Sequence, residues 1–302
     1  MIEVWIPITI GAALAQCWRT ALQQKLRALL SVNAAGLVRY LYGMPVALAI
    51  LLIAMAVTGL PLPHWNWTFL MWCAISGIGQ ILGTNLLIMA FGYRNFAVGT
   101  AYAKTEAAQS SIVALVLIGE MLRPLAWIGI ALGLFGVQVL SLAGRGLKPR
   151  ELLAATVQPA ALCGLGTGFI FALITVTIKL ANQSIDGDNL FVRAMFVLTV
   201  TNALQTVMQG SYLAIREPAE LKKALSSWRS SIWVGTLSAL GSSCWFYAFA
   251  IAPVALVRSL GQIEVVFTLL FSRFYLKETL KRSEVIGLCF VVFSVVLILA
   301  GR

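Results

Sequence analysis

The sequence predicts an all-α integral membrane protein of ten transmembrane helices, arranged as two inverted repeats of five helices each. Composition is the first reason: 60% of the 302 residues are hydrophobic and 11% are charged, with a mean hydropathy of +0.90. Soluble domains carry roughly 25% charged residues. The second reason is that apolar runs recur at the length that a bilayer requires. The third is that the second half of the chain repeats the pattern of the first.

The apolar runs are the expected membrane spans. A bilayer core about 30 Å thick requires roughly 20 apolar residues of a helix, and lipid offers backbone groups no partner, so each run must be helical. Glycine, proline and charged residues separate the runs. The expected spans are Val4–Leu22, Ala35–Val57, Phe69–Ala90, Ala97–Ile118, Pro124–Leu142, Gln158–Leu180, Leu190–Ile215, Ser231–Ile251, Pro253–Phe274 and Val285–Ala300.

Internal repetition divides these spans into two units. A shift of 158 positions superposes glutamates and glycines, and a shift of 154 superposes basic residues nearer the N-terminus. Glutamates are rare here, so their coincidence carries more weight than that of apolar residues. The matched pairs include Glu106 with Glu264, Glu120 with Glu278, Gly129 with Gly287, Lys25 with Lys179 and Arg39 with Arg193. The expected division is a first five-helix unit at 1–143, a basic linker at 144–157 and a second five-helix unit at 158–302.

The net charge of +11 is distributed as in a membrane protein. Most Lys and Arg residues lie between apolar runs, where they meet anionic headgroups, so the expected partner is the lipid bilayer and not nucleic acid. An odd number of spans per unit makes the second unit enter the membrane from the opposite side. Basic residues concentrate after the odd-numbered spans, and positive-inside counting places those segments in the cytoplasm. The expected location is the inner membrane of the cell, as a multi-pass protein.

Lys104 and Glu106 lie inside the expected span Ala97–Ile118. A charge at the centre of a span costs about 2.5–3.5 kcal/mol, so two on one helix need a reason. Residues two apart on a helix point about 200° away from each other, so these two cannot simply neutralise one another. Two interpretations stay open. The charges line a substrate cavity, or an ion pair between helices holds the fold together.

Other polar and aromatic residues at comparable depth complete a candidate substrate site. The repeat places Gln262 and Glu264 level with Lys104 and Glu106. Glu264 has apolar sequence neighbours and is the candidate for proton coupling. Arg19 has two interpretations, because it also lies near enough to a span end to reach the headgroups. The expected substrate-binding residues are Gln16, Arg19, Asn85, Tyr102, Lys104, Glu106, Trp245, Tyr247, Arg258, Gln262 and Glu264.

The remaining motifs have structural interpretations. Glu120 and Glu278 fall at helix ends, where a cap or hinge role is expected. Glycines four positions apart predict close helix packing. The cysteines stand one to an apolar run, without a CxxC motif, so neither a metal nor another cofactor is expected. The glycine pairs are Gly79 with Gly83, Gly129 with Gly133 and Gly164 with Gly168.

Several of these features together resemble a known family. Arg39 and Arg193 open the second span of each unit, and "GEML" at Glu120 and "KETL" at Glu278 each precede a span with an early glycine. This pattern resembles the drug/metabolite transporter superfamily, specifically its EamA-type members, over essentially the whole chain. The resemblance implies a single-chain transporter with a central cavity walled by spans of both units. It also implies cytoplasmic termini, whereas the charge counts place the odd-numbered segments there, so the orientation stays open.

The expected function is secondary transport by alternating access, in the direction of export. The glutamates suit an amine or a proton, and Lys104 and Arg258 suit a carboxylate or a phosphate. The two signs together favour a small polar or zwitterionic metabolite such as an amino acid. One alternative is a multidrug exporter of lipophilic cations. Another is a membrane-embedded enzyme of lipid metabolism, but the sequence has no HxxxxD or HExxH motif and no Asp or His inside a span, so no enzymatic activity is expected. The protein is expected to be a monomer or a homodimer.

Overall fold

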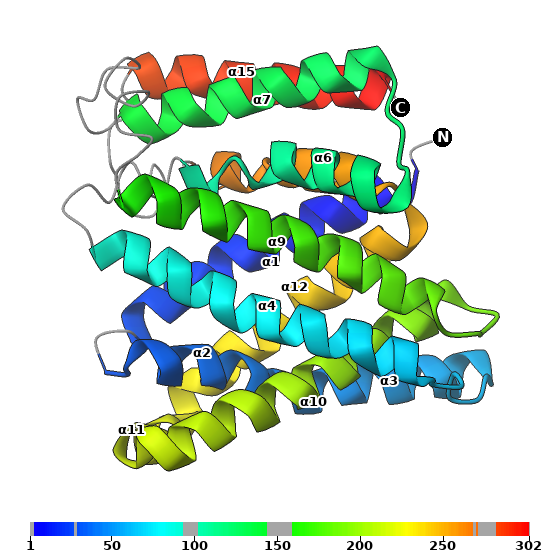
Figure 1. Ribbon diagram of the computed structural model, residues 1–302, viewed down its shortest axis with the longest axis vertical. Helices are drawn as coiled ribbons and strands as arrows, with labels where there is room; N and C mark the ends of the chain where they lie inside the picture. The colour runs from blue at the N-terminus through cyan, green and yellow to red at the C-terminus, as the bar shows by residue number, and fades with distance from the viewer. Residues whose placement is uncertain are drawn as a thin grey trace. The chain divides into compact units, whose positions relative to one another are not determined.

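The structure, a computed structural model, describes residues 3–26, 29–92, 102–143, 159–267, 270 and 282–301. Within these ranges the chain is helical and contains no strand, apart from an isolated backbone bridge between His64 and Asp186 (Figure 1). The helices are α1 Trp5–Leu26, α2 Val32–Leu41, α3 Gly43–Thr58, α4 Trp67–Gly92, α6 Glu106–Ile118, α7 Pro124–Ala143, α9 Pro159–Gln183, α10 Leu190–Arg216, α11 Pro218–Ser226, α12 Trp228–Ile251, α13 Val254–Gly261 and α15 Arg282–Ala300.

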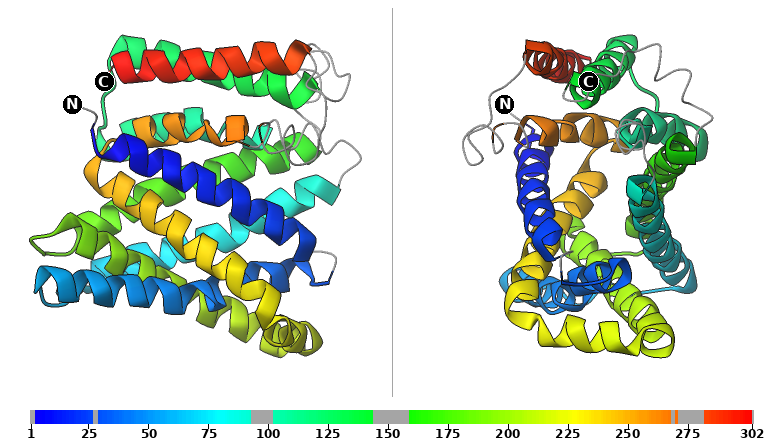
Figure 2. Two further views of the ribbon diagram at one scale, coloured as in Figure 1. Left: turned by 180° about the vertical axis from the view of Figure 1, so that it is seen from behind. Right: turned by 90° about the vertical axis from the view of Figure 1, so that its left-hand side faces the viewer.

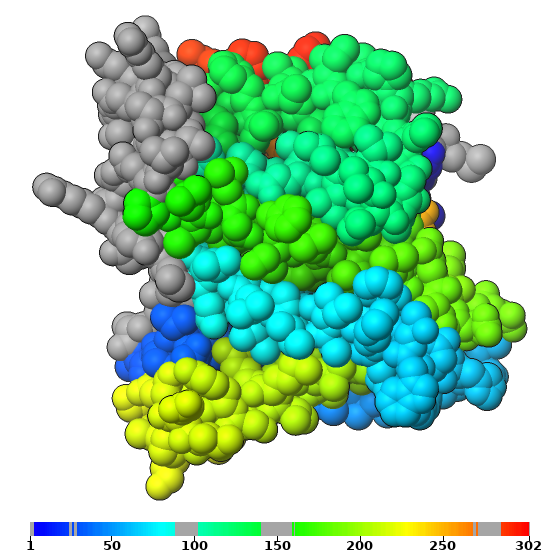
Figure 3. All heavy atoms as spheres, in the orientation of Figure 1, coloured from blue at the N-terminus to red at the C-terminus, as the bar shows by residue number. Residues whose placement is uncertain are grey.

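Several of these helices are long and apolar enough to cross a bilayer. In the part of the chain that the structure describes, 5 segments are long and apolar enough, and three shorter apolar helices accompany them. Large apolar side chains point outward, among them Val57, Ile128 and Phe135, at 81%, 58% and 52% exposure. Figure 3 shows one face of this surface. An apolar exterior suits lipid, so the all-helical, multi-pass membrane class is confirmed; the count of ten spans stays a prediction.

The chain forms two compact units, and each takes segments from both sequence repeats. Unit 1 comprises Met1–Ile81 and Thr177–Ala252, and unit 2 comprises Leu82–Val176 and Pro253–Arg302. The boundaries fall inside α4 and α9. These units are defined by which residues pack together and not by sequence similarity. The division into sequence repeats at 1–143 and 158–302 stays a prediction. The predicted linker at 144–157 lies outside the described residues.

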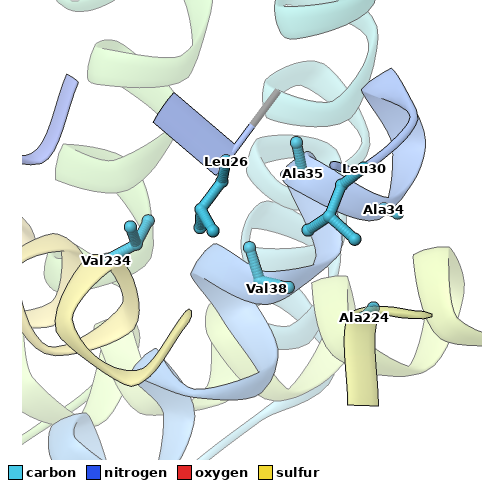
Figure 4. Close-up of a cluster of buried hydrophobic side chains, with 7 residues drawn as sticks. All are labelled: Leu26, Leu30, Ala34, Ala35, Val38, Ala224 and Val234. Carbon is cyan, nitrogen blue, oxygen red and sulfur yellow. The ribbon is translucent and has the colours of Figure 1, made fainter. Parts of the chain in front are cut away.

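In unit 1, α1 lies along α12, and α10 packs against α2 and α3 (Figure 2). Close approach is possible where one partner is glycine: a Cβ on Gly235 of α12 would lie 2.5 Å from the carbonyl carbon of Tyr42. Figure 4 shows the buried apolar cluster that joins the end of α1 to α2, α11 and α12. Its members are Leu26, Leu30, Ala34, Ala35, Val38, Ala224 and Val234.

The expected span Ala35–Val57 lies within one segment that is long and apolar enough to cross a membrane, Val32–Thr58, and Tyr42 divides that segment into α2 and α3. Tyr42 ends α2 and begins α3. Its hydroxyl donates to the carbonyl oxygens of Ala224 and Leu225, each at 3.2 Å. The backbone of Gly235 on α12 packs closely against the backbone of Tyr42 and Gly43. The break therefore lies where a neighbouring helix and a tyrosine side chain fix the chain, a tertiary effect that the apolar pattern does not encode.

In unit 2, α7 and α15 form a close antiparallel pair, drawn in green and red in Figure 1. A Cβ on Gly129 would lie 2.7 Å from Ile298 Cγ1, and one on Gly133 would lie 2.7 Å from Ser294 Oγ. The predicted packing role of this glycine pair is confirmed. The rings of Phe135 and Phe290 meet edge to face at 5.1 Å beside it. Small residues let the two backbones approach, and dispersion contacts then hold them.

Candidate functional site

Two ion pairs link the chain around α6 to the chain around α13 within unit 2. Arg258 Nη1 lies 3.0 Å from Glu106 Oε1, and Lys104 Nζ lies 4.0 Å from Glu264 Oε2. The first pair is the more buried, with side chains 18% and 22% exposed. In the second pair the lysine is 40% exposed and the glutamate 17%. As their spacing requires, Lys104 and Glu106 meet different partners.

The pairing corrects one part of the sequence interpretation. Glu264 was expected among apolar neighbours, but it is paired with Lys104. Glu106 instead meets Arg258. The physical reason is that sequence neighbours on a helix point apart, so the partner of each charge is decided by the element packed against it.

Each pair lies at an interruption of a helix. The expected spans Ala97–Ile118 and Pro253–Phe274 are not continuous in their described parts, which corrects the prediction: turns occupy 104–105 and 262–263. The two turns are 158 residues apart, the same shift that superposes the glutamates. The residues 97–101 and most of 268–274 lie outside the described ranges. Interrupted helices inside a membrane protein are typical of transporter binding sites, where freed backbone groups and side chains line a polar site.

Local hydrogen bonds explain the first interruption. The backbone N–H of Thr105 donates to Tyr102 O at 3.1 Å, three residues back, and its hydroxyl donates to the same oxygen at 2.6 Å. The side-chain amide of Gln109 donates to Thr105 Oγ1 at 2.6 Å. A threonine that bonds to the preceding turn competes with the regular helical ladder. The turn before Glu106 is thus stabilised by side chains of its own segment.

The second interruption also has backbone hydrogen bonds that span three residues, like the bond from Thr105 to Tyr102. The N–H groups of Gln262 and Ile263 donate to Ser259 O and Leu260 O, at 3.2 and 3.0 Å. Both bonds span three residues instead of four, which is the 3₁₀ pattern that often marks a hinge.

A glycine of a neighbouring helix lies against each interruption. A Cβ on Gly168 of α9 would lie 3.3 Å from both Ala103 O and the backbone N of Glu106. A Cβ on Gly133 of α7 would lie 2.8 Å from Gln262 Oε1. Each turn therefore packs against a helix at a position without a side chain, and a larger residue in place of Gly168 or Gly133 would displace the turn.

The remaining expected site residues divide between the two units. In unit 1, Trp245 Nε1 donates to Gln16 Oε1 at 3.1 Å, which joins α12 to α1. The ring of Tyr247 meets that of Phe191 edge to face at 5.1 Å. Arg19 is half-buried on α1 in unit 1, whereas Asn85 on α4 and Tyr102 belong to unit 2. The structure thus brings the four charged residues together, and it brings Gln16 and Trp245 together.

A buried polar stripe on α10 was missed by the sequence interpretation. Asn202, Gln205 and Gln209 are only 8%, 0% and 5% exposed. Gln205 donates to Gln80 Oε1 at 2.9 Å, and Gln209 donates to Asn33 O at 3.0 Å. The spacing of three and four residues within an apolar span was the available signal, because polar side chains there face protein and not lipid.

Within the described ranges no group of three or more His, Cys, Asp or Glu side chains is close enough to hold a metal ion. The chemistry that the charged residues offer is recognition of charge: two cationic and two carboxylate groups, each facing one of opposite sign.

Charged pairs at interrupted helices of a multi-pass helical protein define a membrane transporter as the class. Residues 158–300 match the model of the EamA-like transporter family. The resemblance to the EamA-type members of the drug/metabolite transporter superfamily is therefore confirmed over residues 158–300. A solved crystal structure of a protein is similar over 99% of this chain and 97% of that chain, with a TM-score of 0.75 and 18% identity, which shows a shared fold. The search of curated proteins gave no match.

Proposed function

We propose that the protein is a secondary transporter that exports a small zwitterionic metabolite, such as an amino acid, across the inner membrane by alternating access. The observation that carries this proposal is that two ion pairs, Arg258 with Glu106 and Lys104 with Glu264, join two interrupted helices. The two interruptions lie at equivalent positions of the sequence repeat. The substrate would bind between these charges. Its carboxylate would take the place of a glutamate beside a cationic side chain, and its ammonium group would meet the carboxylate so released.

Charge balance favours a zwitterion over a lipophilic cation. A zwitterion brings both signs, so every charge of the site keeps an opposite neighbour in the bound state. A monovalent cation placed against Glu106 or Glu264 would separate that glutamate from its arginine or lysine and leave a cationic side chain uncompensated. An uncompensated charge away from water costs several kcal/mol in typical cases, about 3–5 for a buried pair that loses one partner.

The inverted repeat of ten helices belongs to the same proposal. Its support is that helical structure resumes at Glu106 after the first turn and at Glu264 after the second, a shift of 158. The two turns at 104–105 and 262–263 match as well. Inverted repeats with interrupted helices are the usual basis of alternating access. The turns would act as hinges when the site opens to one side or the other.

Proton coupling through Glu264 is part of the proposed mechanism. Glu264 has the longer ion pair, 4.0 Å, and its lysine partner is 40% exposed. Of the two glutamates of the site, Glu264 is the one whose cationic partner is farther away and more accessible to water, so we assign the exchangeable proton to it. Glu264→Gln should therefore flatten the pH dependence of transport in proteoliposomes. An unchanged pH profile would remove Glu264 from the coupling step.

A thermal-shift screen of the purified full chain tests the substrate class. Amino acids should raise the melting temperature, because a ligand that binds only the folded state stabilises it, whereas phosphorylated metabolites and lipophilic cations should have little effect. Lys104→Ala removes the more exposed pair, worth less than about 1 kcal/mol, so the empty variant should melt almost as the wild type does and lose the ligand response. A strongly destabilised variant that still responds to ligand would show that the pair is a structural clasp. Stabilisation by lipophilic cations alone would establish the multidrug alternative.

A further inference from the structure

The short helix α11 lies at a membrane surface by connectivity. It follows α10 and precedes α12, and both of these helices are long and apolar enough to span the bilayer. Its sequence "PAELKKALS" is polar by comparison and carries both acidic and basic side chains. Ala224 is its buried residue, so most of the helix is accessible at the surface of unit 1 (Figure 3, yellow).

The acidic side chains of this region face the protein. Glu217 accepts hydrogen bonds from Ser31 Oγ at 3.1 Å and from Asn33 Nδ2 at 2.7 Å. Glu220 accepts one from the backbone N–H of Ser31 at 2.7 Å. Ser31 is the N-cap of α2, so both carboxylates lie at the positive end of that helix. Their negative charge is offset inside the protein and contributes little to the outer surface.

The basic side chains of the region face outward. Arg216, Lys222 and Arg229 are exposed, whereas Lys223 pairs with Glu220 at 2.6 Å. Leu225 and Trp228 are exposed beside them, at 51% and 52%. We define the α11 face as Arg216, Lys222, Leu225, Trp228 and Arg229. It carries three unbalanced positive charges among two apolar side chains.

We propose that the α11 face is a binding site for anionic phospholipids of the adjoining leaflet. The lipid phosphates would contact Lys222 and Arg229, and Leu225 and Trp228 would enter the boundary between headgroups and acyl chains. The guanidinium of Arg229 lies 5.4 Å from the ring centroid of Trp228, so cation and aromatic ring are already presented together. Basic residues with tryptophan and leucine on a short surface helix are the combination that binds anionic interfaces.

Lipid titration of the purified full chain in a neutral detergent tests the charge requirement. Phosphatidylglycerol should raise the melting temperature, and phosphatidylcholine should not. Each of Lys222→Gln and Arg229→Gln should raise the phosphatidylglycerol concentration at the midpoint about fivefold, the change expected for one surface charge. Arg123→Gln is the matched control, because it removes an exposed basic residue from a short segment elsewhere and should leave the midpoint unchanged. Equal effects of the two lipids, or of the control variant, would overturn the proposal.

Fluorescence quenching tests the position of the lipid. Vesicles that contain brominated phosphatidylglycerol should quench the wild type more than the Trp228→Phe variant, and brominated phosphatidylcholine at the same fraction should quench both to a similar extent. Soluble glycerol phosphate is the second arm of the titration. If it alone reproduces the full stabilisation, the face binds free anions and the lipid assignment is wrong. These measurements require no transport substrate, so they are independent of the proposed function.

Discussion

Glu120 Oε2 accepts the backbone N–H of Val254 at 2.8 Å, so a residue just beyond α6 caps the beginning of α13. The capping role expected for Glu120 is confirmed, and its counterpart Glu278 lies outside the described residues. The geometry depends on Gly119, whose φ of 68° ends α6 in a left-handed turn and directs the chain away. Because α6 and α13 flank the two ion pairs, this hydrogen bond adds to the contacts that hold the two elements together around the candidate site.

Glu120→Ala should lower the free energy of unfolding by about 1 kcal/mol, the usual cost of a lost helix cap. The variant loses both an acceptor for the Val254 N–H and a negative charge at the positive end of α13. Glu120→Gln keeps an acceptor and should lose less than half as much. The measurement is unfolding in mixed micelles with increasing denaturing detergent. Identical curves for wild type and Glu120→Ala would show that water replaces the cap without loss.

Arg258→Ala should destabilise the empty protein more than Lys104→Ala does. Removing one partner of a buried pair costs about 3 kcal/mol or more, whereas an exposed pair contributes less than about 1 kcal/mol. The Arg258 pair is the closer and more buried one, at 3.0 Å against 4.0 Å. Melting temperatures of the two variants without ligand provide the comparison. Equal losses would mean that water reaches both pairs alike.

Gly235→Ala should destabilise unit 1 by about 1–3 kcal/mol, the usual cost of overpacking. The new methyl group would lie 2.5 Å from the carbonyl carbon of Tyr42 and 2.7 Å from the backbone N of Gly43, and backbone atoms cannot move aside cheaply. Gly11→Ala is the control, because nothing lies within 4 Å of its Cβ position. That variant should be neutral or more stable by up to about 1 kcal/mol, as alanine favours a helix. A melting temperature of Gly235→Ala at or above that of the wild type would contradict the packing described for α2, α3 and α12.

Glu220 should make stability pH-dependent on the acidic side. The hydrogen bond from Lys223, and then the one from the Ser31 N–H, hold the pKa of this carboxyl below its ordinary value. A carboxyl with a lowered folded-state pKa stabilises the fold at neutral pH, and this contribution is lost as the pH falls below about 4.3 and through the folded-state pKa. The melting temperature of Glu220→Gln should therefore be lower than that of the wild type at pH 7, with the gap closing toward pH 3. A gap that stays constant over this range would exclude the ionised carboxylate as its source.

The candidate site could be predicted from the sequence only as a set of residues. Lys104, Glu106, Arg258 and Glu264 stand out because charges inside apolar runs are costly, and the structure brings these four together. Their pairing could not be predicted, because it depends on which helix lies opposite and on turns at 104–105 and 262–263 that the apolar pattern passes over. The stripe of Asn202, Gln205 and Gln209 was missed, since uncharged polar residues carry a weaker signal in a long apolar run.

The sequence by itself determined the membrane class, the helical fold and the resemblance to the family, because apolar runs of bilayer length permit only helices and because repeated glutamates and glycines survive as a visible pattern. The tertiary structure decided where helices break and which side chains meet. The break at Tyr42 depends on Gly235 and on the carbonyl groups of Ala224 and Leu225, nearly 200 residues further along the chain. Hydropathy is a property of each residue and its near neighbours, whereas a break or an ion pair depends on atoms that only folding brings within a few ångströms of each other.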